Sequence, residues 1–158
     1  MTIFTPILQV LLAGVVIFVL GVIAWRDYKT GKIPDLLSLA LLVCGIVALV
    51  VYDQPDLRAR LIGLVAISGP LLLITLAKPR AIGGGDVKLM AAAGFLLGWK
   101  AVLVAFGLGV VLAGVYAVYL LASKKKKRNE HFPFGPALCV GIAVSYFFSG
   151  QVIGFLFG

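Results

Sequence analysis

Residues 7–25 read ILQVLLAGVVIFVLGVIAW, a run of 19 residues without a charge, and Arg26 and Asp27 follow it directly. A helix needs about 20 apolar residues to cross the hydrocarbon core of a bilayer. The residues before the run lack the basic region of a signal peptide, so we expect this helix to be retained. The stretch therefore predicts a transmembrane helix that ends at a carboxylate.

Further apolar runs lie at 36–52, 61–77, 87–99, 101–122 and 137–157, separated by charges, proline and glycine. The mean hydropathy is +1.14 and 62% of the residues are hydrophobic, more than a soluble fold can bury. We expect one membrane-embedded domain over residues 1–158, an all-α bundle of about six transmembrane helices. The fourth run is short. It spans only if the glycines before it continue the helix, or if its start is sunk among other helices.

The 14 cations outnumber the six acidic residues, which gives a formal charge of +8. Because these cations flank apolar runs, they indicate contact with membrane lipids, and we expect no nucleic-acid partner. Eleven of them follow the first, third and fifth runs. The positive-inside rule then predicts that both termini lie outside and that these three loops are cytoplasmic. The eleven are Arg26, Lys29, Lys32, Lys78, Arg80, Lys88, Lys124, Lys125, Lys126, Lys127 and Arg128.

Two carboxylates, Asp27 and Asp86, are predicted at this cytoplasmic face. Asp86 closes the run Gly83-Gly84-Gly85-Asp86 before an apolar helix. A carboxylate at a membrane boundary is costly to keep, which makes it a candidate for function. The structural alternative is a turn whose aspartate caps the next helix. Lys88 would face away from Asp86 on a helix, so it is not expected to act as its counter-ion.

The remaining polar candidates are weaker. Asp35 follows Pro34 immediately before an apolar run, which is typical of a helix start. Cys44 and Cys139 lie inside apolar runs, and the sequence has no Cys-x-x-Cys motif, so both cysteines are interpreted as packing residues. His131 is the only histidine. We therefore expect neither a metal nor another cofactor.

Two motifs taken together resemble a known family. Residues 27–35 fit the pattern Asp-x5-[Leu/Ile]-Pro-[Asp/Asn], and residues 83–89 fit Gly-x-Gly-Asp-x-Lys-Leu. A third stretch, Pro133-Phe134-Gly135-Pro136, precedes the last apolar run. In this order the motifs resemble the type IV prepilin peptidases, the membrane aspartic proteases of the GxGD type, over nearly the whole chain.

The resemblance implies a membrane aspartic endopeptidase of the bacterial inner membrane. Its substrates would be prepilin-like proteins, whose short basic leader is cut from an apolar helix at the cytoplasmic face, usually after a glycine. Asp27 and Asp86 would be catalytic. They would share one proton and activate water, because two close carboxylates do not readily both ionise. Residues expected to bind substrate or shape the site are Gly83, Gly85, Lys88, Pro34, Pro133 and Gly135.

One difference from the larger bacterial enzymes is apparent. Those enzymes add an N-terminal region with paired Cys-x-x-Cys motifs, which this sequence lacks. The resemblance therefore implies a short form with peptidase activity only, and methyltransferase activity is not expected.

The alternative is a non-enzymatic protein, either a small membrane transporter or a subunit for pilus or secretion assembly. In such a protein Asp27 and Asp86 would bind a cation or a partner's basic segment. Transporters usually bury polar groups near the middle of the membrane. The apolar runs of this chain hold few polar side chains, chiefly Ser68, Thr75 and Ser145.

The uneven distribution of cations gives a testable topology. In a variant that lacks Cys44 and Cys139, single cysteines at Thr30 and Ser123 should react with a reagent supplied from the cytoplasm. A cysteine at Gln54 should react only from outside. Cytoplasmic labelling at Gln54 would reverse the topology.

Overall fold

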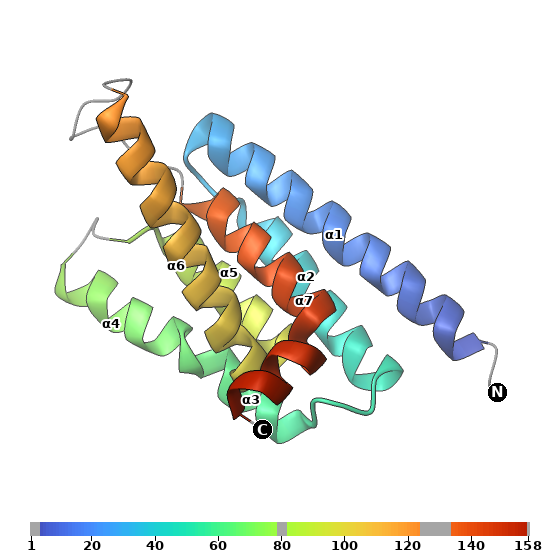
Figure 1. Ribbon diagram of the computed structural model, residues 1–158. Helices are drawn as coiled ribbons and strands as arrows, with labels where there is room; N and C mark the ends of the chain where they lie inside the picture. Colours follow the sequence, from blue (N-terminus) through green and yellow to red (C-terminus); the bar gives the residue numbers. More distant parts are fainter. Residues whose placement is uncertain (1–3, 79–81, 124–133, 158) are drawn as a thin grey trace.

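The computed structural model describes residues 4–78, 82–123 and 134–157, and all regular elements in these ranges are α-helices. They are α1 (Phe4–Thr30), α2 (Asp35–Val51), α3 (Leu57–Ala66), α4 (Ser68–Ala77), α5 (Gly84–Leu97), α6 (Trp99–Ala122) and α7 (Gly135–Phe157). Figure 1 shows them as one bundle, with the end of α1 and the start of α7 at the same end of the molecule.

The bundle has the apolar surface that a membrane requires. Three stretches, Pro6–Thr30, Leu57–Ala77 and Trp99–Ala122, are long and apolar enough to cross a bilayer by length and composition. Large side chains such as Phe18 and Val118 point outward, and they are 71% and 67% exposed. In water such a surface would be unfavourable, whereas in lipid it meets hydrocarbon. The expected all-α membrane bundle is confirmed.

The third apolar run differs from its expected form, because it is two helices. The break lies at Ile67, between α3 and α4. Pro70 has no backbone N–H to donate to the carbonyl of Ala66, so a continuous helix would lose a hydrogen bond here. The hydroxyl of Ser68 donates to the carbonyl of Leu64 beside the break.

Helix α5 lies at the centre of the bundle and contacts α2, α3, α4, α6 and α7. It begins at Gly84, so Gly84 and Gly85 belong to the helix. This is the first of the two alternatives that the sequence left open for the short fourth run. Gly63 of α3 and Gly94 of α5 cross backbone to backbone, and a Cβ on Gly94 would lie 2.0 Å from the Gly63 carbonyl oxygen. Glycine is therefore needed for α3 and α5 to approach this closely.

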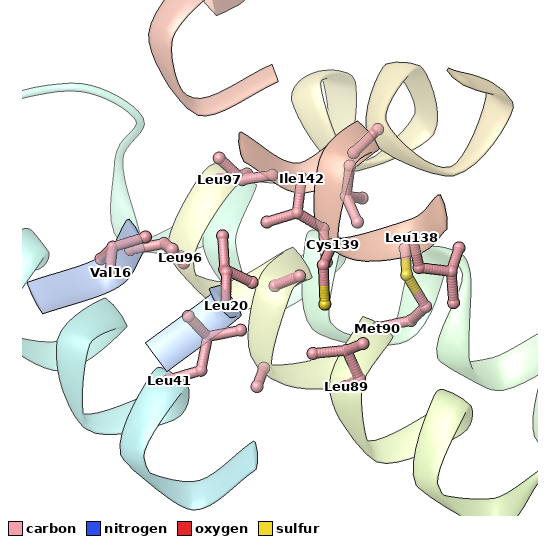
Figure 2. Close-up of a cluster of buried hydrophobic side chains, with 14 of the residues drawn as sticks. Val16, Leu20, Leu41, Leu89, Met90, Leu96, Leu97, Leu138, Cys139 and Ile142 are labelled. Carbon is pink, nitrogen blue, oxygen red and sulfur yellow. The ribbon is translucent and has the colours of Figure 1, made fainter. Parts of the chain in front are cut away.

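The core is built around α5. Figure 2 shows side chains of four helices meeting there: Val16 and Leu20 of α1, Leu41 of α2, Leu89, Met90, Leu96 and Leu97 of α5, and Leu138, Cys139 and Ile142 of α7. Cys44 and Cys139 are buried free cysteines, which agrees with their interpretation as packing residues. Helices α6 and α7 also pack closely, and Ser145 donates to the Ala101 carbonyl at 2.7 Å.

Arg60 is the largest fully buried side chain and is 0% exposed. In the sequence Arg60 falls between the apolar runs 36–52 and 61–77, but it lies inside α3. Its guanidinium donates to backbone carbonyls only, at 2.9–3.4 Å. Four of these carbonyls lie near the C-termini of α2 and α5, where a cation also complements the helix dipole. The acceptors belong to Gly45, Ala48, Pro55, Phe95 and Leu96.

Replacing Arg60 should therefore destabilise the fold. Arg60→Met should cost roughly 2 kcal/mol, because buried carbonyls lose their donor. For a chain of this size that corresponds to a fall in Tm of about 4–8 °C, measurable by thermal unfolding in detergent. Arg58→Met is the matched control, since Arg58 is exposed in the same helix. Equal Tm values for the two variants would contradict this role.

Candidate active site

Asp27 faces the interior of the bundle. It continues the buried stripe of α1 formed by Leu12, Val16, Leu20 and Ile23, whose spacing keeps them on one helix face. Asp27 itself is only 5% exposed. The carboxylate lies in the last turns of α1, which ends at Thr30 before Gly31 turns the chain with a φ of 63°.

The carboxylate of Asp27 contacts the start of α7. Its Oδ2 accepts a hydrogen bond from the backbone N–H of Gly135 at 2.9 Å. A Cβ at Gly135 would lie 2.5 Å from the same oxygen, so only glycine allows this approach. The N-terminus of a helix carries a partial positive charge, and it stabilises a nearby anion. The start of α7 therefore holds the Asp27 carboxylate in place through one backbone hydrogen bond.

Asp86 lies in the first turn of α5 and is partly buried. Its backbone N–H donates to the Gly83 carbonyl at 3.0 Å. A Cβ at Gly83 would lie 3.1 Å from Asp86 Oδ2, so the carboxylate folds back over Gly83. Asp86 therefore also lies at a helix N-terminus.

Gly85 brings the two sequence motifs into contact. A Cβ at Gly85 would lie 2.9 Å from the Cβ of Ile33, which belongs to the loop between α1 and α2. In contrast, a Cβ at Gly84 would meet no atom within 4 Å. Internal contacts therefore explain why residues 83 and 85 are glycine, whereas they do not explain the glycine at position 84.

A cavity of about 270 Å³ lies between these elements. Both carboxylates line it, and the buried thiol of Cys139 on α7 lies close enough to feel the charge of each. The lining combines glycine backbone, two acids, one ammonium group and two apolar side chains. Its members are Asp27, Gly31, Lys32, Ile33, Gly83, Gly84, Gly85, Asp86 and Phe134.

The sequence-predicted residues divide into three groups. Asp27, Asp86, Gly83 and Gly85 line the cavity, and Gly135 contacts Asp27. Two residues do not line it: Pro34 precedes the first residue of α2, and Lys88 bonds to Asp35 Oδ2 at 2.7 Å. Pro133 lies outside the described residues. Asp35 is the first residue of α2, as its sequence context predicted.

The structure adds Gly31, Lys32, Ile33 and Phe134 to the cavity. Three of them had a signal in the sequence. Ile33 and Phe134 belong to the motif stretches, and Gly31 follows a helix end, where glycine commonly turns the chain. Lys32 carried no signal, because a lysine beside a membrane helix is usually a solvated anchor.

This arrangement can hold water between two carboxylates. Asp27 contacts the N-terminus of α7, and Asp86 lies in the first turn of α5. An ionised carboxylate can take a proton from water while a protonated one donates a hydrogen bond to a carbonyl oxygen. The chemistry suits hydrolysis of an amide bond.

Comparison with known proteins identifies the family of this chain. Residues 14–118 match the family model described as the type IV leader peptidase family. A Bacillus subtilis protein named prepilin leader peptidase/N-methyltransferase is 28% identical over 94% of this chain and 60% of its own length. Proteins of the same name from Burkholderia pseudomallei and Escherichia coli K12 are 35% and 31% identical, over 77% and 90% of this chain.

The chain spans 60%, 41% and 64% of the lengths of these three relatives. No solved structure matches it significantly. The family model nevertheless covers most of the chain, including Asp27, Asp86 and the glycines between α4 and α5. The chain therefore belongs to the type IV leader peptidase family.

Proposed function

We propose that this protein is an aspartic endopeptidase that removes the short basic leader of prepilin-like substrates. The observation that carries the proposal is that Asp27 and Asp86, which belong to two separate sequence motifs, line one cavity. Membership of a leader peptidase family favours this function over a transporter. The acids also lie at one end of the bundle rather than at mid-membrane, where transporters bind substrates.

In the proposed reaction, the two carboxylates share one proton, because two close anions repel each other. The ionised carboxylate removes a proton from water, and the resulting nucleophile attacks the scissile carbonyl carbon. The protonated carboxylate donates a hydrogen bond to the carbonyl oxygen. The carboxylate that took the proton from water then gives it to the amide nitrogen. Collapse of the tetrahedral intermediate breaks the C–N bond and gives a carboxylate on the leader and an amine on the apolar helix.

The distribution of the cations indicates on which side of the membrane the cavity lies. Arg26, Lys29 and Lys32, three of the cations that predict the cytoplasmic side, lie close to Asp27 in the sequence, and Lys32 lines the cavity, so the positive-inside rule favours a cavity at the cytoplasmic face. We propose that the protein acts in the inner membrane of a bacterium. The scissile bond, after a glycine where leader meets helix, would then lie at the depth of the carboxylates.

If Asp27 and Asp86 act as one unit, removing either should cost nearly as much as removing both. Asp27→Asn, Asp86→Asn and the double variant should all insert normally and fail to release the leader, measured by mass spectrometry. Asp53→Asn is the control and should stay within about twofold of the wild type, because Asp53 is exposed in the loop between α2 and α3 and does not line the cavity. Clear residual cleavage in either single active-site variant would argue against the two-aspartate mechanism.

The glycines give a second test. Gly85→Ala should lower leader release at least tenfold, because its Cβ would push Ile33 and move the loop beside the cavity. Gly84→Ala is the matched control and should retain most of the activity, since its Cβ meets no atom. Equal activities of the two variants would mean that the contact between Gly85 and Ile33 does not shape the site.

A further inference from the structure

A second cavity lies on the surface between α2 and α5, and it shares no residue with the candidate active site. Its volume is about 250 Å³. We call it the α2–α5 groove and define it by the residues that line it: Asp35, Ser38, Leu39 and Leu42 of α2, Leu64 of α3, and Lys88, Ala91 and Ala92 of α5.

Ser38 is the unusual member of the groove. It is 5% exposed, and its Oγ has no hydrogen-bond partner among the described residues. Other buried or half-buried hydroxyls in the apolar helices are satisfied. Ser68 and Thr75 donate to carbonyls four residues earlier in the chain, and Ser145 donates to a neighbouring helix. A hydroxyl without a partner in hydrocarbon is unfavourable, so the Oγ of Ser38 points to a partner from outside the chain.

The rest of the groove suits an apolar helix. Leu39, Leu42 and Leu64 are apolar side chains of its lining, and Ala91 and Ala92 present small side chains. Small residues let a second helix approach closely in lipid. From Asp35 to Leu42 the groove follows α2 for about 10 Å, or two helical turns.

The mouth of the groove carries charge. Asp35 and Lys88 form an ion pair at 2.7 Å there, and their side chains are 73% and 56% exposed. Asp35 is the only exposed carboxylate at this end of the bundle among the described residues. Lys88 bonds to Oδ2 of Asp35, and the Asp35 side chain stays 73% exposed, so a cation of a basic leader whose helix lies below it can also reach this carboxylate.

The groove is also positioned to deliver a peptide to the carboxylates. Lys88 at its mouth lies two residues beyond Asp86 on α5, which is about 3 Å along the helix axis. The two residues lie on different faces of α5, and the glycines of its N-terminus come just before both. A helix held in the groove therefore ends beside Gly83–Gly85, and an extended segment can cross this surface to reach Asp86.

We infer that the α2–α5 groove binds the apolar transmembrane helix of the leader-bearing substrate. This inference rests on the proposed function and adds to it a binding surface distinct from the cavity that cuts the bond. The Oγ of Ser38 bonds to a polar group of the substrate helix, and the two alanines form the surface against which that helix lies.

The test uses the full chain in nanodiscs and two probes. One probe has a lysine-rich leader that ends in glycine, followed by a 20-residue apolar helix. The other keeps the leader and the first few apolar residues but has no transmembrane helix. Ala91→Leu should raise KM at least tenfold for the first probe and leave kcat/KM within twofold for the second. Ser38→Ala should raise KM about threefold for the first probe only.

Ala117→Leu is the matched control, because Ala117 is a half-buried alanine of α6 that lines neither cavity. It should alter cleavage of neither probe. Wild-type protein that cleaves neither probe would contradict the proposed function itself. If Ala91→Leu kept the wild-type KM and kcat/KM on both probes, only the inference about the α2–α5 groove would be overturned.

Cross-linking provides a readout that does not depend on turnover. A photoreactive residue at Leu39, in an Asp86→Asn background, should cross-link to the helix of the first probe. The same group at Val118 on α6, which is 67% exposed, should not. Cross-links from Leu39 to lipid alone, or to a second copy of the chain, would assign the groove to another occupant and overturn the inference.

Discussion

A helix of 14 residues rises only about 21 Å, less than the roughly 30 Å thickness of a bilayer's hydrocarbon core. Helix α5 is such a helix, and it lies at the centre of this bundle. Its unpaired backbone groups at both ends must therefore be satisfied at membrane depth, where water is scarce. At the C-terminus of α5, Arg60 satisfies two of these groups, because its guanidinium donates to the carbonyls of Phe95 and Leu96.

At the N-terminus of α5, the unpaired backbone groups lie at the candidate active site. The first turn holds a carboxylate, Asp86, against Gly83, and the start of α7 holds a second carboxylate, Asp27, through Gly135. Two helix N-termini thus stabilise negative charge on the same cavity. Backbone N–H groups and helix dipoles stabilise acidic groups at this depth, as the bond from Gly135 to Asp27 illustrates.

The glycines around this cavity have separate physical reasons. Gly83 leaves room for the Asp86 carboxylate, Gly85 for the side chain of Ile33, and Gly135 for the Asp27 carboxylate. Each prevents a clash between parts of the chain that the active site must bring together. Flexibility is not required to explain them, since none of these three has a positive φ among the described backbone angles.

The sequence alone predicted a helical membrane protein, the ends of most of its apolar runs but not the break at Ile67, and a common end of the bundle for Asp27 and Asp86. Hydrophobicity, cation distribution and helix-start residues such as Asp35 are local signals, and solvent partitioning acts on each run separately. The paired motifs also carried the family resemblance. Tertiary structure decided what each side chain touches: Arg60 inside the core, Lys88 on Asp35, Lys32 at the cavity, and Ser38 without an internal partner. Asp27 and Gly135 lie 108 residues apart, and only the packing of α1 against α7 brings them together, because crossing angles and close approaches between helices leave no periodic trace in an all-apolar run.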